Sequence, residues 1–361
     1  MNRRLWLQRT ATVGAGLLVA PCLSGQPRVP LARSASPTIY LDANENPYGP
    51  SPRAREAMRE ALAGGNRYPD TGPLLDGLAE TLGVTREYLV LGHGSFELLC
   101  TAASAFAGRE VVTPYPSFNV IADRAERAGA NVRYVPLTDA HALDLDAMEA
   151  AITRETDLVY VCNPNNPTGT IVPDRELRPF VQRASESALV VVDEAYHEYV
   201  QSPAYASLVD LVREGREVVL LRTFSKIYGL AGMRVGYAVA RPDLAARLRA
   251  HSVGVLNSAG LAAALASLGD EGFVRTSRLR NAEARAVLIG HLRANAMPYA
   301  ESHGSFVWAR TPGPFVRLRQ SLARQDILIG DGPTPESRWG RISLGTPDEM
   351  ERLGAALSAS L

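Results

Sequence analysis

The stretch Asp157-Leu-Val-Tyr-Val-Cys-Asn-Pro-Asn-Asn-Pro-Thr-Gly169 decides the fold class of this chain. Its first half is a nearly continuous apolar run, typical of a strand buried on both faces, and its second half is a turn. Similar apolar runs recur along the chain, with helical patterns such as 96–107 and 174–185 between most of them. These runs are Tyr88–Leu91, Glu110–Thr113, Leu189–Val192, Val218–Leu221 and Gly236–Ala240. The alternation predicts an α/β fold with a mainly parallel central sheet covered by helices on both faces.

The pattern changes after about Arg241, where long helices alternate with short strands. Helices are expected at 243–253, 261–268 and 271–294, and strands at 306–309, 327–329 and 341–343. This part of the chain predicts a second, smaller α+β domain, which agrees with the length of 361 residues.

Composition excludes several classes of protein. The formal net charge is zero, so nothing indicates a nucleic-acid partner or an anionic membrane surface. Cys22, Cys100 and Cys162 are too few and too scattered for a disulfide framework or a zinc site, and no metal site is expected. The last two of these cysteines lie in apolar runs and are expected to be core residues.

The first 36 residues differ from the rest. Arg3-Arg4-Leu5-Trp6-Leu7 precedes a weakly apolar run, Thr10–Ala20, and a Pro/Ser/Arg-rich stretch follows. The apolar run is too short to span a bilayer as a helix, so no stable membrane span is expected. The pattern is typical of a twin-arginine export signal, which predicts a periplasmic or otherwise exported protein. A cytoplasmic protein with a disordered head, or an uncleaved N-terminal anchor, remains the alternative.

Lys226 is the only lysine in the chain, and the other 37 of the 38 basic residues are arginine. Codon bias in a GC-rich genome explains the arginines, but it does not explain why one position keeps its amine. Arginine cannot act as a Schiff-base nucleophile because its guanidinium stays protonated and delocalised. The pattern therefore indicates a chemical role for Lys226.

Four segments carry residues suited to a ligand site. The Asn163–Gly169 turn follows a strand, where α/β sheets place their ligands. Asp193 ends another buried strand, where an acid is costly unless it is paired or catalytic. The hydroxyls in Thr223-Phe-Ser-Lys226, with Arg234 downstream, suit a bound phosphate. Gly92-His-Gly-Ser95 lies at the start of a predicted helix, whose free N–H groups bind anions.

Together these segments resemble the fold-type-I pyridoxal-phosphate (PLP) aminotransferases, specifically the histidinol-phosphate aminotransferase-like branch. The resemblance covers about residues 40–361 and keeps the family's order. Its further motifs are Leu41-Asp-Ala-Asn-Glu-Asn-Pro-Tyr-Gly49, Arg67-Tyr-Pro69, Pro116-Ser-Phe118 and Arg341-Ile-Ser-Leu-Gly-Thr346. It implies an N-terminal arm and small-domain segment at 37–66, a large PLP-binding domain at 67–255 and a small C-terminal domain at 256–361, after the signal and linker at 1–36.

The resemblance also implies a role for each site residue. Lys226 holds the cofactor as a Schiff base and shuttles a proton, and Asp193 pairs with the pyridinium nitrogen. Asn166 and Tyr196 hydrogen-bond the cofactor's 3-oxygen, while Phe118 stacks on the ring. The phosphate is held by Thr223, Ser225, Arg234 and the helix start at Gly94, Ser95 and Phe96. Arg341, Tyr48 and Asn166 face the substrate. Tyr68 reaches the cofactor of a neighbouring subunit, which implies a homodimer with shared active sites.

The resemblance implies exchange of an amino group between an amino acid and a 2-oxo acid. Histidinol-phosphate transamination proper, a PLP decarboxylase or lyase, and a non-catalytic binding protein are the alternatives. Two positions depart from the branch. The branch usually has an acid directly before the glutamate of its Gly-Ser-Asp-Glu turn, whereas this chain has Phe96 before Glu97. If the turn binds its ligand through backbone N–H groups, this change matters little. Gly330 stands where the family has an arginine that grips the substrate phosphate, and this argues against a phosphorylated substrate, although Arg338 could replace it.

Overall fold

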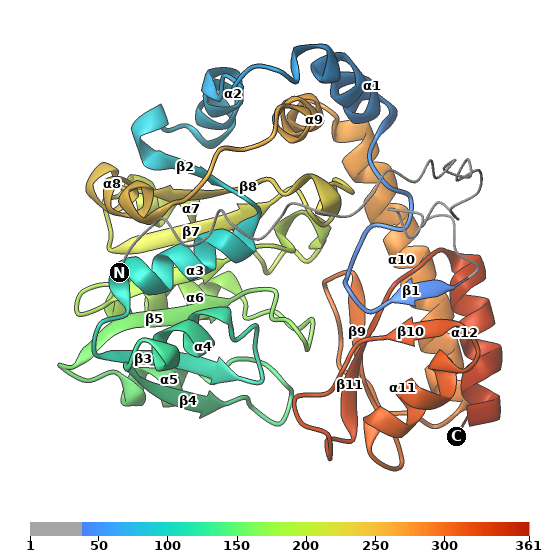
Figure 1. Cartoon of the computed structure of the whole chain (residues 1–361). Coiled ribbons are helices and arrows are strands. Elements are labelled where there is room, and N and C mark those ends of the chain that lie inside the picture. Colours follow the sequence, from blue (N-terminus) through green and yellow to red (C-terminus); the bar gives the residue numbers. More distant parts are fainter. Residues whose placement is uncertain (1–37, 361) are drawn as a thin grey trace, which may run out of the picture. The chain divides into compact units, whose positions relative to one another are not determined.

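The computed structural model describes residues 38–360, so the predicted export signal lies outside the described residues. A seven-stranded sheet in the order β2-β8-β7-β6-β5-β3-β4 forms the centre of the larger lobe (Figure 1). Only β8 runs antiparallel to its neighbours, so the predicted mainly parallel sheet is confirmed. The strands are β2 (Leu89–Gly92), β3 (Glu110–Tyr115), β4 (Asn131–Pro136), β5 (Thr156–Cys162), β6 (Leu189–Asp193), β7 (Val218–Thr223) and β8 (Gly236–Ala240).

Helices cover both faces of this sheet because its central strands are apolar on both sides. Side chains of β6 that point to one face join a core with α2 (Gly72–Leu82), α5 (Leu145–Ala151), α6 (Asp174–Ala184), α7 (Val209–Arg213) and α9 (Ser258–Leu268). Side chains that point to the other face pack with α3 (Ser95–Phe106), α4 (Val120–Arg127) and α8 (Pro242–His251). The two-faced burial is the physical reason for the continuous apolar strands in the sequence.

The smaller lobe has its own core and two short ribbons of strands (Figure 1). β1 (Ile39–Leu41) pairs in parallel with β10 (Ile327–Ile329), and β9 (Phe306–Arg310) pairs antiparallel to β11 (Trp339–Ser343). Three helices pack on them: α10 (Glu271–Ala294), α11 (Phe315–Ala323) and α12 (Pro347–Ser360). The first strand of the described chain therefore finds its pairing partner almost 300 residues later in the sequence.

The packing of two helices differs from the expected domain limits. α9 lies beyond the expected boundary at 255/256, yet its buried Leu261, Ala263 and Ala264 belong to a core of the large lobe. α1 (Pro52–Ala61), in the expected N-terminal arm, packs on α9 rather than on the small lobe. The larger lobe therefore includes α1 and α9, because α1 packs on α9 and Ala54 of α1 belongs to the same core as the buried residues of α9.

The strand ends that carry the predicted site converge on one edge of the sheet. Cys162 at the end of β5 is opposite Asp193 at the end of β6, and Thr223 ends the neighbouring β7. Gly236 at the start of β8 faces Gly92 on one side and Thr223 on the other. A Cβ at Gly236 would lie 2.6 Å from the Ser95 nitrogen, so only glycine lets the start of α3 approach this edge.

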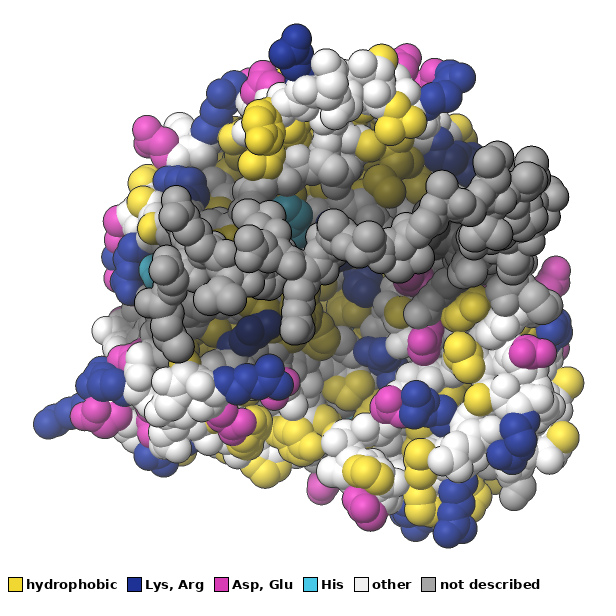
Figure 2. Space-filling view, in the orientation of Figure 1, with side chains coloured by type: hydrophobic (Ala, Val, Ile, Leu, Met, Phe, Trp, Pro, Cys, Tyr) yellow, Lys and Arg dark blue, Asp and Glu magenta, His cyan; other side chains and the backbone are white. Residues whose placement is uncertain are grey.

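Surface features of the described chain are ordinary. On the described part of the face drawn in Figure 2, basic and acidic side chains are interspersed. Within residues 38–360, every helix is too short or too polar to cross a bilayer. The same residues contain no group of three or more His, Cys, Asp or Glu side chains that could hold a metal ion.

Candidate active site

A cavity of about 460 Å³ opens at the carboxyl edge of the sheet. Its walls come from the ends of β5, β6 and β7, the start of α3, the segment 43–45 and the small-lobe strand β11. Eleven residues with a predicted role line it: Ser95, Phe96, Phe118, Asn166, Asp193, Tyr196, Thr223, Ser225, Lys226, Arg234 and Arg341. The fold thus brings nearly all of the predicted site residues to one place.

Lys226 lies in this cavity just beyond the end of β7. Its Nζ donates a hydrogen bond to the carbonyl oxygen of Ala43 at 3.1 Å and lies 5.8 Å from the centre of the Tyr196 ring. Burial lowers the pKa of Lys226 to about 8, with a further contribution from the positive charge of Arg341. The unprotonated fraction, which a nucleophile or proton acceptor requires, therefore rises from about a tenth at pH 7 to about half at pH 8.

Asp193 is buried at the end of β6 with both carboxylate oxygens engaged. Oδ1 accepts from the backbone N–H of Ala195 at 3.0 Å, and Oδ2 accepts from the Tyr160 hydroxyl at 3.1 Å. Burial nevertheless raises the pKa of Asp193 to about 6, so a positive partner in the cavity would be needed to keep it firmly ionised. The adjacent Glu194 is occupied elsewhere: it forms a buried ion pair with Arg222, with Nη2 and Oε2 2.9 Å apart.

The opposite part of the cavity is rich in hydrogen-bond donors. Thr223 Oγ1 donates to Ser225 Oγ at 2.9 Å, and Arg234 Nη1 contacts the same Ser225 hydroxyl at 3.4 Å. The free N–H groups at the start of α3 add to these donors, since Gly94 precedes the helix with φ +81°. A Cβ at Gly94 would lie 2.7 Å from Arg234 Nη2, so glycine leaves room for the arginine.

Arg341 and Asn166 meet on the side of the small lobe. Arg341 Nη1 donates to Asn166 Oδ1 at 2.8 Å, and Nη2 donates to the Asp42 carbonyl at 2.5 Å. The Arg341 Nε is buried without a hydrogen-bond partner among the described residues. The positive charge of Arg341 in the cavity wall suits an incoming carboxylate. Phe118 forms a half-buried wall and contacts Phe96 edge-on, with ring centres 6.4 Å apart.

The residues present fit PLP. A cup of hydroxyls, an arginine and a helix N-terminus suits its phosphate, and a nearby amine suits its aldehyde. A buried carboxylate held by two donors suits a protonated ring nitrogen. This donor set is the chemistry that a phosphorylated pyridine aldehyde requires.

Three residues with a predicted role do not line the cavity. Gly94 precedes α3 and approaches Arg234, while the two tyrosines lie elsewhere. Tyr48 packs beneath Arg280, whose guanidinium lies 4.3 Å from the ring centre. Tyr68 is 90% exposed and lines a separate surface hollow. Tyr68 was predicted to act in a neighbouring subunit, which one chain does not test. Within this chain, the cavity forms without either tyrosine.

Several residues that line or contact the cavity had no role predicted from the sequence. Asn44 and Glu45 line the cavity, and Tyr160 holds Asp193. The Leu41–Gly49 motif contained the first two, but nothing in the sequence said that this segment crosses the cavity. Cys162 is buried, as expected of a core residue, yet it also lines the cavity, where burial raises the pKa of its thiol.

A second hollow of about 330 Å³ adjoins the cavity and shares Phe118, Asn166 and Arg341 with it. Gly330 lies in its wall, and a Cβ there would be 2.7 Å from the Arg341 carbonyl oxygen. The neighbouring Asp331 pairs with Arg319, with Oδ1 and Nη1 2.8 Å apart. The close approach of β11 therefore makes glycine the residue that fits position 330 in this chain.

Comparisons with known proteins agree with this geometry. The family model for aminotransferase class I and II matches residues 36–357. The chain is 37% identical to histidinol-phosphate aminotransferase 1 of Cupriavidus pinatubonensis, over 95% of this chain and 94% of that protein. It is 38% identical to histidinol-phosphate aminotransferase 2 of Ralstonia nicotianae, over 95% of each. The crystal structure of histidinol-phosphate aminotransferase from Sinorhizobium meliloti in complex with PLP superposes with a TM-score of 0.83 at 30% identity, covering 90% of each chain. The chain therefore belongs to the class I and II aminotransferases, PLP-dependent enzymes that exchange an amino group between an amino acid and a 2-oxo acid.

Proposed function

We propose that this aminotransferase acts on an unphosphorylated amino acid, with Lys226 as the group that carries the cofactor and moves the proton. The observation that carries the proposal is the position of the chain's sole lysine in one cavity with Asp193, the donor cup and Arg341. When bound, PLP supplies an electron sink for the carbon that loses its proton.

The remaining roles follow from the chemistry of the side chains. Asp193 keeps the ring nitrogen protonated, and in return that positive charge stabilises the buried carboxylate. Lys226, with its pKa lowered to about 8, accepts and returns the proton at the substrate's α-carbon. Tyr196 and Asn166 would hydrogen-bond the cofactor's 3-oxygen. Thr223, Ser225, Arg234 and the start of α3 would bind its phosphate, and Arg341 would bind the substrate's carboxylate.

The substrate preference rests on the hollow next to Gly330. An arginine at that position would add a charge-assisted pair with a substrate phosphate, and its absence removes about 1.5–3 kcal/mol of binding. Besides Arg341, the charged side chains of the hollow are Asp42, Asp331 and Arg319, and the last two pair with each other. The two arginines and two aspartates of the hollow balance one another in formal charge, so it offers no excess positive charge for a phosphate.

Histidinol-phosphate transamination is the second candidate, because the relatives at 37–38% identity carry that name. A decarboxylase or lyase on the same cofactor residues is a third possibility. Steady-state kinetics with a panel of amino acids and histidinol phosphate, each with a 2-oxo acid acceptor, separates these candidates. We expect the highest kcat/KM for an unphosphorylated amino acid, with stoichiometric 2-oxo acid product. A preference for histidinol phosphate would refute the interpretation of Gly330, and release of carbon dioxide would refute transamination.

We also propose a homodimer that places Tyr68 at the partner's cofactor. Tyr68 is 90% exposed, and Leu62 and Val255 in the same hollow are 70% and 58% exposed. Large apolar side chains gathered on one surface are typical of an interface between subunits. Sedimentation equilibrium is expected to give twice the chain mass, and a Leu62→Asp, Val255→Asp variant is expected to be monomeric and inactive.

Finally, we propose export through the twin-arginine route, supported by the Arg3-Arg4 pair and the weakly apolar run after it. The cofactor site is assembled only in the folded chain, so a protein exported folded carries its PLP with it. Fractionation of cells that express wild type or an Arg3→Lys, Arg4→Lys variant tests this proposal. Export of wild type alone is expected, and retention of both proteins with residues 1–36 attached would refute it.

A further inference from the structure

The segment just after β1 lies in the wall of the active-site cavity and touches three residues of the proposed machinery. Ala43 accepts from Lys226, and the Asp42 carbonyl accepts from Arg341. Asn44, which is 1% exposed and has φ 55°, reaches Tyr196 through its side chain. A non-glycine residue in the left-handed region usually has a specific reason to be there. Its hydrogen bonds supply that reason.

Asn44 and Ser343 form two hydrogen bonds with each other. The backbone N–H of Asn44 donates to Ser343 Oγ at 2.9 Å, and the Ser343 hydroxyl donates to Asn44 Oδ1 at 2.6 Å. A backbone N–H can only donate, so the direction of the first bond is fixed. The serine has one proton, and the Asn44 amide oxygen is the acceptor it reaches. Turning the amide over would leave that buried proton without an acceptor, which is costly.

With the amide oxygen facing Ser343, the Asn44 amide nitrogen must face Tyr196. Nδ2 lies 2.8 Å from the Tyr196 hydroxyl oxygen. An amide N–H₂ cannot accept, so the tyrosine oxygen accepts there and its own proton must point elsewhere. Burial raises the pKa of Tyr196, so this proton is present at neutral pH. Tyr196 lines the cavity, and no protein atom among residues 38–360 accepts that proton.

We propose that Asn44 and Ser343 are positioning residues that orient the Tyr196 hydroxyl as a donor into the cavity. The proposal rests on the role of Tyr196 under the proposed function, because the donated proton would meet the cofactor's 3-oxygen. A donor fixed in advance favours an anionic oxygen at that place without any rearrangement when the cofactor binds. The backbone N–H of Asn44 thus fixes the direction of the Ser343 hydroxyl, and through the Asn44 amide it makes Tyr196 a donor into the cavity.

The test follows the visible absorbance of bound PLP as a function of pH, which requires no turnover. Removing a hydrogen bond to an anionic oxygen raises the midpoint of that titration by about one to two pH units. We expect this rise for Tyr196→Phe. We also expect it for Asn44→Asp, whose new carboxylate would accept the Tyr196 proton and turn it away from the cavity. Ser343→Ala, which frees the amide to turn, is expected to raise the midpoint by a smaller amount.

Two controls separate the orientation of Tyr196 by Asn44 and Ser343 from the effects of losing any nearby hydroxyl or adding a charge. Ser305→Ala removes another buried serine hydroxyl that contacts Asn44, at its carbonyl oxygen (3.4 Å), and is expected to leave the midpoint unchanged. Asn44→Asp in the Tyr196→Phe background measures the effect of the added charge alone, and is expected to shift the midpoint by less than in wild type.

The outcomes distinguish the positioning role of Asn44 and Ser343 from the proposed role of Tyr196 on which it rests. Asn44→Asp could shift the midpoint equally in wild type and in Tyr196→Phe, while Ser343→Ala shifts it not at all. This result would overturn the positioning role of Asn44 and Ser343 and leave the role of Tyr196 intact. An unchanged midpoint in Tyr196→Phe would overturn both. A chromophore that forms without Lys226 would overturn the proposed function.

Discussion

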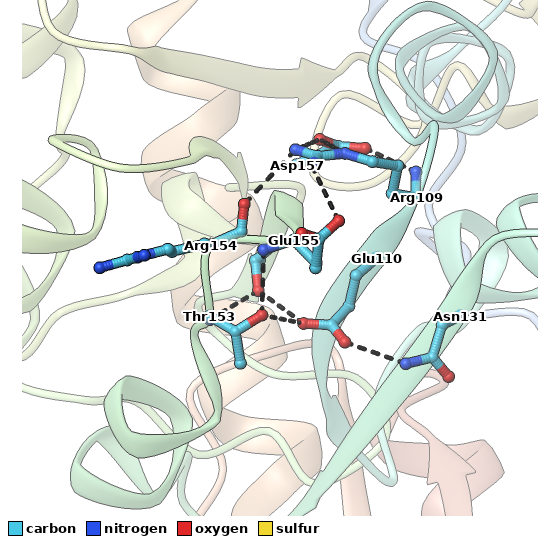
Figure 3. Close-up of polar contacts among 8 residues, drawn as sticks. Arg109, Glu110, Asn131, Thr153, Arg154, Glu155 and Asp157 are labelled. Carbon is cyan, nitrogen blue, oxygen red and sulfur yellow. Dashed lines mark hydrogen bonds and ion pairs between the residues drawn. The ribbon is translucent and has the colours of Figure 1, made fainter.

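Glu110 at the start of β3 is expected to hold the amino end of the sheet together without affecting catalysis. Its carboxylate is 3% exposed and accepts four hydrogen bonds. Thr153 and Thr156 donate to Oε1 at 2.9 and 2.8 Å, and Asn131 and Arg133 donate to Oε2 at 2.9 and 2.6 Å. Figure 3 shows Glu110 between Thr153 and Asn131. The Glu155 backbone N–H donates to Thr153 Oγ1 at 3.1 Å and so joins the cluster of Arg109, Glu155 and Asp157 to this group. The active-site cavity lies at the other ends of these strands.

The size of the effect follows from the pKa of this carboxyl. Burial would raise it, but the bonds from Arg133, Thr156, Thr153 and Asn131 together outweigh burial and lower the pKa from 4.5 to about 2. Because Arg133 is half exposed, we discount the full shift and expect ionised Glu110 to contribute about 2 kcal/mol. The folded pKa lies below the unfolded one, so this stability is complete above about pH 5 and is lost as the pH falls from 4.5 toward 2. About 1 kcal/mol of it is lost between pH 7 and pH 4.

The assay is urea unfolding of Glu110→Gln and Glu110→Ala at pH 7 and pH 4. Glu110→Ala leaves four donors without an acceptor and is expected to lower the free energy of unfolding by about 3 kcal/mol. Glu110→Gln keeps the shape and is expected to lower it by about 2 kcal/mol at pH 7 and by about 1 kcal/mol at pH 4. Glu155→Ala is the matched control: its pair with Arg109 is exposed, so the free energy of unfolding is expected to stay almost unchanged. A Glu110→Gln variant as stable as wild type at pH 7, or a change in its kcat, would refute the reasoning.

The other predictions concern the active site. Borohydride reduction of the holoenzyme is expected to attach PLP to the Lys226 peptide alone, and Lys226→Ala is expected to lose multiple turnover; an unmodified Lys226 peptide despite bound PLP would contradict this. The apo-protein's lysine is expected to react with an amine reagent half-maximally near pH 8, because burial lowers its pKa from 10.5 to about 8; a midpoint above pH 10 in mass-spectrometric labelling would rule out the lowered pKa. Gly330→Ala is expected to lower kcat/KM about tenfold, since its Cβ would lie 2.7 Å from the Arg341 carbonyl and displace β11; kinetics like those of wild type would show that Arg341 does not depend on this close approach.

Much of the fold could be predicted because its signals are local. β8, β10 and α10 begin and end at the residues that periodicity indicated: Gly236–Ala240, Ile327–Ile329 and Glu271–Ala294. Buried strands and long amphipathic helices show their environment in their own residues. β4 could not be predicted in this way, because it is an edge strand with four exposed residues out of six. β1 has only three residues, and it is a strand because β10 supplies its partner.

By itself, the sequence determined the chemistry of this protein: one lysine, an acid at a strand end, a hydroxyl-rich loop and an arginine after it. These signals can be recognised because neighbours along the chain indicate the use of each group, such as the hydroxyls that precede Lys226. Only the tertiary structure decided how these groups act on one another. The lowered pKa of Lys226, the crowding of Gly330 by Arg341 and the bonds from Asn44 to Tyr196 and Ser343 depend on residues far apart in the sequence. Burial, steric fit and the direction of a hydrogen bond are properties of groups brought together by packing, so no local pattern records them.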